Sequence, residues 1–181
     1  MSEHITTANK IHFLPLEPKQ EDILIEDIAH ALSLMTRANG HFPEFYSVGQ
    51  HCIGCSKEAL ARGYSNEVAL MCLLHDASEA YISDITRPVK KEMKEYIVIE
   101  RRLQNAIYER FLDRLPSKEE QEQISGIDDA MLYHEFYHYM GEKILPEGLQ
   151  LHTEPDFYER PFQEVEQEFL SQYRKLAENL Q

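Results

Sequence analysis

The sequence predicts an all-α protein built from about six helices. Apolar residues recur at the three- and four-residue spacing of helices along most of the chain. Ser47 with Gln50, and Ser117 with Glu120, have the pattern of a helix capping box. No stretch alternates apolar and polar residues as a half-buried strand does. With 181 residues, 43% of them hydrophobic, the chain can bury the core of a single domain over residues 1–181.

The elements follow from this spacing and from the residues that start and stop helices. Ser65 can cap the third helix, Gly63 suits the end of the second, and Pro161 suits the first turn of the last. Residues 1–20 are predicted to form an N-terminal arm and residues 145–160 a proline-rich loop. We expect helices over residues 23–37, 47–62, 65–81, 89–112, 117–140, with a break near Ser125 and Gly126, and 161–176.

Charge and composition limit the partners and the compartment. The net charge of −14 and the isoelectric point near 5.0 disfavour binding to a nucleic-acid polymer or an anionic membrane surface. No apolar run reaches the roughly 20 residues of a membrane-spanning helix. The N-terminal residues are polar and do not resemble a signal peptide, and three cysteines is an odd number. We therefore expect a cytoplasmic protein with reduced thiols.

An apolar run followed by acidic and histidine side chains marks the candidate site. Val68–Leu74 leads directly into His75 and Asp76, and Glu79 and Asp84 follow within nine residues. Buried carboxylates without partners are costly, and a bound cation relieves that cost. A site of imidazoles and carboxylates suits a divalent transition metal or Mn. The residues that could build it come from three predicted helices: His51, His75, Asp76, and Asp128 or Asp129.

Several segments carry a resemblance to a known family, in the family's order over about residues 11–140. They are Ile25–Ser33, Arg37–His41, Phe45–His51, Leu73–Tyr81, Asp84–Lys90 and Asp128–Glu135. Together they resemble the HD-domain metal-dependent phosphohydrolases. The similarity is greatest to the small nucleotidase branch, which includes bacterial 5'-deoxynucleotidases and phage dATP triphosphohydrolases. The resemblance implies an HD-type helical bundle, a homo-oligomer and a nucleotide substrate.

The resemblance also assigns roles to individual residues. It implies a divalent metal (Mn, Co, Zn, Fe or Mg) held by His51, His75, Asp76 and Asp128. Asp128 is preferred over Asp129 because the family has a glutamate seven residues after the ligand, and Glu135 stands there. Glu79 and Asp84 match the acids that hold and deprotonate the attacking water, and Arg37 and Lys90 match phosphate-binding positions. Ala38 stands where the family often has an aromatic residue.

Other interpretations use different residues. His134, Glu135 and His138 form the H-E-x-x-H pattern of zinc proteases, which needs a third ligand. The extended form of that pattern has a histidine where this chain has Ile144. Cys52 and Cys55 could begin a zinc knuckle, although no second ligand pair follows at a suitable spacing. A regulatory module that binds nucleotide and metal without turnover is the remaining alternative.

Overall fold

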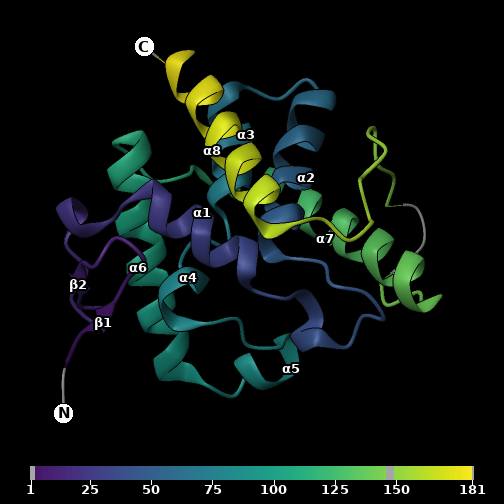
Figure 1. Ribbon diagram of the computed structural model, residues 1–181. Helices are drawn as coiled ribbons and strands as arrows, with labels where there is room; N and C mark the ends of the chain where they lie inside the picture. The colour runs from purple at the N-terminus through teal and green to yellow at the C-terminus, as the bar shows by residue number, and fades with distance from the viewer. Residues whose placement is uncertain (1–2, 146–148, 181) are drawn as a thin grey trace.

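Helix α3, Asn66–Leu74, lies at the centre of the fold because it is apolar on every side (Figure 1). Every residue from Val68 to Leu74 is buried. The structure is a computed structural model that describes residues 3–145 and 149–180, and it confirms the all-α class. Four longer helices pack around α3: α2 (Val48–Ala61), α6 (Lys94–Leu112), α7 (Lys118–Met140) and α8 (Phe162–Glu178).

The remaining helices complete the bundle. Helix α1, Ile25–Leu34, packs against α2 and α8, and α8 crosses over the surface formed by α1, α2 and α3 (Figure 1). Two helices of a single turn, α4 (Glu79–Ile82) and α5 (Arg87–Lys90), follow α3. One cluster of buried apolar side chains extends through the chain from Phe13 to Leu176. None of the described helices is both long and apolar enough to cross a membrane.

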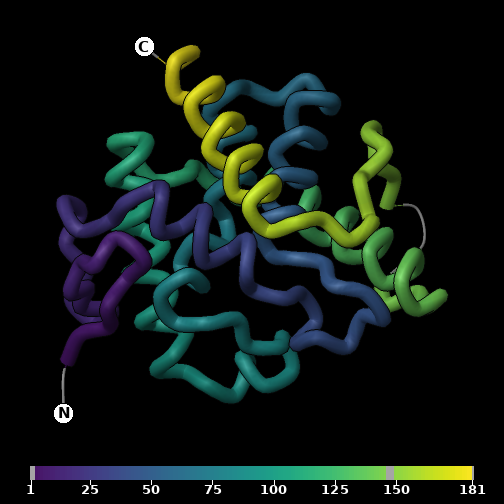
Figure 2. Tube along the Cα trace, in the orientation of Figure 1, coloured from purple at the N-terminus to yellow at the C-terminus, as the bar shows by residue number. Residues whose placement is uncertain are grey.

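The N-terminal segment folds back as a small hairpin beside α6 (Figure 2). Strand β1, Ile5–Thr6, pairs antiparallel with β2, His12–Phe13. The Phe13 ring is fully buried and stacks on Tyr81 with their centroids 4.1 Å apart. The arm predicted for residues 1–20 therefore docks on the body, although residues 1–2 lie outside the described part. The sequence pattern did not predict this hairpin.

The helix predicted over residues 65–81 is wrong in its second half. Helix α3 ends at Leu74, and a turn carries residues 75–78 before α4 begins. The side chain of Gln104 holds this turn, because its Nε2 donates to the Leu74 carbonyl at 2.7 Å and its Oε1 accepts from the Ser78 amide at 3.1 Å. A tertiary contact from α6 thus satisfies backbone groups that a longer helix would have paired internally.

Other boundaries differ less. The predicted helix over residues 89–112 is interrupted, since α5 ends at Lys90 and α6 begins at Lys94. Helix α1 ends three residues before Arg37, which lies in a 3₁₀ turn. Helix α7 continues through Gly126 without the predicted break. In the predicted loop 145–160, residues 149–160 have no helix or strand, and residues 146–148 lie outside the described part.

Gly49 sets how closely α1 and α2 approach, and replacing it tests that contact. A Cβ added at Gly49 would lie 3.2 Å from backbone atoms of Leu32 and Ser33, which cannot move independently of α1. We expect Gly49→Ala to lower the free energy of unfolding by about 1–3 kcal/mol in a denaturant titration. The control is Gly54→Ala, whose new Cβ meets only the flexible end of Met131. Equal losses in both variants would contradict this account.

Candidate metal centre

Four side chains from three segments converge on one point below the C-terminal end of α3. His51 comes from α2, His75 and Asp76 from the turn after α3, and Asp128 from α7. The His51 Nε2 atom lies 3.2 Å from His75 Nε2 and 3.2 Å from Asp128 Oδ1. His75 Nε2 lies 3.3 Å from Asp76 Oδ2. We call these four residues the His/Asp cluster.

Hydrogen bonds fix which ring nitrogen each histidine presents to the cluster. His51 Nδ1 donates to Glu135 Oε1 at 2.6 Å, and His75 Nδ1 donates to the Cys72 carbonyl at 2.8 Å. Each imidazole therefore carries its proton on Nδ1, and its Nε2 lone pair faces the cluster. Carboxylates and carbonyls hold metal-binding histidines in this way in known metal sites.

The spacing of the cluster atoms fits ligands of a single ion. Two nitrogen or oxygen ligands about 2.1 Å from a metal lie about 3.4 Å apart at the tetrahedral angle. Five distances between donor atoms of the cluster range from 3.2 Å to 3.8 Å. Two lone pairs and two carboxylates at these distances repel one another unless positive charge lies between them. The residues present thus fit a divalent cation.

In the metal-free protein, protons must supply that positive charge. Burial lowers the pKa of His75, but the carboxylates of Asp76 and Asp128 outweigh it, so the pKa lies well above its ordinary value. Burial raises the pKa of Asp128, but hydrogen bonds with His51 and His75 hold it well below its ordinary value. Protons and a divalent cation therefore compete for the same place, and metal affinity falls with decreasing pH.

Glu135 connects the cluster to Arg37. Its side chain is fully buried, and besides His51 it accepts a hydrogen bond from Arg37 Nη2 at 3.1 Å. Burial raises the pKa of Glu135, but Arg37 and His51 lower it to about 2. The sequence pattern favours Asp128 over Asp129 through Glu135 and places Glu135 in an H-E-x-x-H pattern, but it does not predict these contacts with His51 and Arg37. The seven-residue distance between Asp128 and Glu135 is two helical turns, so both face the cluster, and that spacing was the available signal.

A cavity of about 310 Å³ opens beside the cluster. Asp76 and Asp128 contribute to its wall, together with all four of the other predicted site residues: Glu79, Asp84, Arg37 and Lys90. Leu132, Phe136 and Ile144 form an apolar part of the same wall. Six of the eight predicted site residues thus line one cavity, and the other two, His51 and His75, lie within 3.8 Å of Asp76 and Asp128. Their chemical roles stay predictions.

Glu79 is a buried acid in the cavity wall, and one of its carboxylate oxygens lacks a hydrogen-bond partner within the part of the chain that the structure describes. It is 4% exposed, and its Oε2 has no hydrogen-bond partner among the described residues. Burial, followed by the charges of Asp76 and Asp84, raises the pKa of Glu79 well above its ordinary value. A carboxylate that is buried beside other negative charges needs either a proton or a nearby positive charge.

Arg87 forms hydrogen bonds with Asp128 and with its neighbour Asp129. Its Nη2 donates to Asp128 Oδ2 and its Nη1 to Asp129 Oδ1, both at 2.8 Å. Asp128 therefore places Oδ1 in the cluster and Oδ2 on Arg87, while Asp129 pairs with Arg87 outside the cluster. Arg87 is half exposed and also lines the cavity.

The H-E-x-x-H residues do not form a metal site in the described part of the chain. Glu135 points to His51 and Arg37, as given above. His134 Nε2 donates to the Leu149 carbonyl at 2.8 Å, and the His138 ring lies 5.0 Å from the Phe157 ring, centroid to centroid. The three side chains thus have separate structural contacts, and the geometry does not support a zinc protease.

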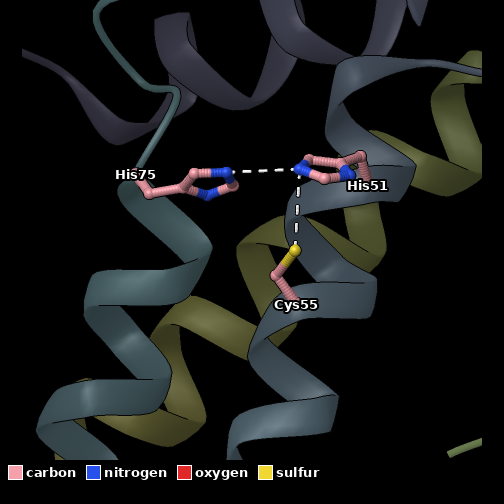
Figure 3. Close-up of side chains that lie close together, drawn as sticks. All are labelled: His51, Cys55 and His75. Atoms are coloured by element: carbon pink, nitrogen blue, oxygen red, sulfur yellow. Dashed lines mark hydrogen bonds between the residues drawn. The ribbon is translucent and has the colours of Figure 1, made fainter. Parts of the chain in front are cut away.

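The three cysteines are buried and free. Among residues 3–145 and 149–180, Cys52 and Cys55 do not form a zinc knuckle with a second pair of ligands. Instead Cys55 lies one turn after His51 on α2, with its Sγ atom 3.6 Å from His51 Nε2 (Figure 3). The donor atoms of His51, Cys55 and His75 all lie within 4.8 Å of one another, so a metal could contact all three.

Two bacterial proteins have sequences similar to this chain. The uncharacterized protein YfdR of Escherichia coli is 37% identical over 107 residues, which cover 59% of this chain and 57% of YfdR. An uncharacterized protein of Rhodobacter capsulatus is 34% identical over 137 residues, covering 64% of this chain and 69% of that protein. The chain belongs to the family of the Rhodobacter capsulatus protein. It spans little more than half of YfdR, and no protein-family model matches it.

The low pKa of Glu135 predicts a loss of stability in acid. Its value of about 2 lies below the ordinary 4.5, so this carboxylate stabilises the metal-free protein above about pH 4.5. That stabilisation, about 3 kcal/mol, is lost as the pH falls toward 2. In denaturant titrations of metal-free protein, Glu135→Gln should lower the free energy of unfolding at neutral pH and flatten its fall between pH 4.5 and 2. The exposed Glu119→Gln is the control and should leave the profile unchanged.

Proposed function

We propose that the protein is a metal-dependent phosphohydrolase that acts on nucleotides, as the resemblance to HD-domain enzymes implies. One observation carries the proposal. The Nε2 atoms of two histidines and the carboxylates of two aspartates converge at 3.2–3.8 Å, and the two aspartates line a cavity. A divalent cation satisfies this arrangement, and the cavity beside it contains both acids and cations.

In this proposal His51, His75, Asp76 and Asp128 hold the metal. A bound divalent metal lowers the pKa of water and polarises a phosphoryl oxygen. Glu79 accepts the proton of the attacking water, since its Oε2 is unpaired and lies in the cavity wall next to the cluster. Asp84 faces the same cavity and helps to hold that water.

Arg37 and Lys90 bind the phosphate group. Burial lowers the pKa of Lys90, but the ion pair with Glu100 at 2.5 Å raises it above its ordinary value, so the side chain stays charged. Arg37 is oriented by Glu135 and lies 3.6 Å from Asp76 through Nη1. Both cations therefore stand beside the cluster, where negative charge builds up on a phosphoryl group during the reaction.

The cavity also supports a nucleoside as the remainder of the substrate. Its volume of about 310 Å³ is at the lower end for small-molecule sites, and one side is apolar through Leu132, Phe136 and Ile144. Ala38 lines the same cavity and lacks the aromatic side chain that the family often has at this position to contact the base. We propose a 5'-deoxynucleotidase or a deoxynucleoside triphosphohydrolase.

Product analysis tests the proposal. Protein loaded with Mn or Co is incubated with ribo- and deoxynucleoside mono- and triphosphates, and the released anion is identified. Orthophosphate indicates a nucleotidase and triphosphate indicates a triphosphohydrolase. Asp76→Ala should lose both metal and turnover, whereas Asp129→Asn should keep its metal, because Asp129 lies outside the cluster. Full activity of Asp76→Ala would contradict the assignment of Asp76 as a ligand of a catalytic metal. Tight nucleotide binding without turnover would instead indicate a regulatory module.

Substitution of Glu79 separates its catalytic role from metal binding. Glu79→Gln should keep the metal and lower kcat by about 10²–10⁴-fold, because the variant cannot accept a proton. It should also raise the free energy of unfolding of the metal-free protein at neutral pH. The folded pKa of Glu79 lies above its ordinary value, so its ionised form costs stability there. A variant with unchanged kcat would exclude Glu79 as the base.

A further inference from the structure

Cys55 places a sulfur atom beside the two histidine nitrogens of the His/Asp cluster. It follows His51 by one helical turn, so both side chains leave the same face of α2. Figure 3 shows the thiol pointing at His51 Nε2, on the side that also faces His75. The residue is 1% exposed, so this sulfur is shielded from solvent.

The distances match a sulfur ligand on the same ion. A nitrogen about 2.1 Å and a sulfur about 2.3 Å from one metal lie about 3.1–3.8 Å apart at the 90–120° angles of a five-coordinate site. Cys55 Sγ lies 3.6 Å from His51 Nε2, and the two Nε2 atoms are 3.2 Å apart. The sulfur thus occupies a ligand position with respect to the lone pairs that the histidines direct into the cluster.

Cys52 provides a contrast within the same helix. Its Sγ atom lies 4.0 Å from His75 Nδ1, and Cys52, His75 and Asp76 also bring donor atoms within 4.8 Å of one another. However, His75 Nδ1 carries the proton that it donates to the Cys72 carbonyl. A metal at that nitrogen would have to displace this hydrogen bond. Cys52 therefore lies beside the ring nitrogen of His75 that is not available to bind a metal.

We propose that Cys55 is an additional metal ligand and biases the site toward Zn, Co or Fe over Mg or Mn. This inference rests on the metal site of the proposed function. On binding, the S–H bond breaks, a sulfur–metal bond forms and the proton leaves to solvent. A thiolate favours borderline and soft metals, whereas imidazole and carboxylate alone leave the choice wider.

Cobalt substitution tests the ligand directly, without any assay of activity. Metal-free full-length protein is titrated with Co(II), and the near-ultraviolet absorption from thiolate-to-cobalt charge transfer is recorded. We expect this band in the unmodified protein and in Cys52→Ser, and its loss in Cys55→Ser. Cys55→Ser should also lower affinity for Zn(II) and Co(II) by about 10–100-fold, with little change for Mn(II). Circular dichroism checks that each variant is folded, and Cys55→Ala is the second variant if the serine unfolds the protein.

The outcomes separate this inference from the proposed function. Stoichiometric Co(II) binding without a charge-transfer band would overturn the role of Cys55 and leave the His/Asp site intact. A band lost in Cys52→Ser but kept in Cys55→Ser would overturn it in favour of the other edge of His75. Failure of the unmodified protein to bind any Co(II) would overturn both the ligand role and the metal site itself.

Discussion

The convergence of two histidine lone pairs and two carboxylates is the constraint on which the rest of the site depends. At separations of 3.2–3.8 Å these groups repel one another unless positive charge lies between them. Apolar packing around α3 forces them together, because the segments that bear them pack directly on that buried helix. Burial of apolar side chains in the core therefore offsets the repulsion among these groups and keeps them close enough to bind one cation.

The same packing ties the cluster to the elements that line the cavity. Glu135 contacts both His51 and Arg37, so one buried carboxylate orients a ring of the cluster and a cation of the cavity wall. Arg37 stands at a turn in which Ala38 and Asn39 have left-handed φ of 51° and 50°. Such residues cost about 1–3 kcal/mol each and persist where the surroundings hold them. Here the Arg37 amide is bound by the Tyr46 carbonyl at 2.8 Å.

Although the chain as a whole is acidic, the wall of its cavity contains both basic and acidic side chains. The chain carries a net charge of −14, but its cavity wall contains Arg37, Arg87 and Lys90 among the acids. Each of these cations is paired with a carboxylate of the protein. Because the wall also contains Asp76, Glu79, Asp84 and Asp128, the proposed function requires the bound cation to supply the positive charge that attracts an anionic substrate.

The sequence by itself determined the helical class, the capped starts of α2 and α7, and most of the residues that meet at the cavity and the His/Asp cluster. These features depend on local spacing and side-chain chemistry, which a sequence contains. Tertiary structure alone decided the end of α3 at Leu74, because Gln104 from α6 satisfies the following turn. It also decided the tautomers of His51 and His75 and the place of Cys55, since these depend on groups distant in sequence or on the direction of a side chain. Ordered motifs can identify which groups meet, but only packing fixes which of their atoms face one another.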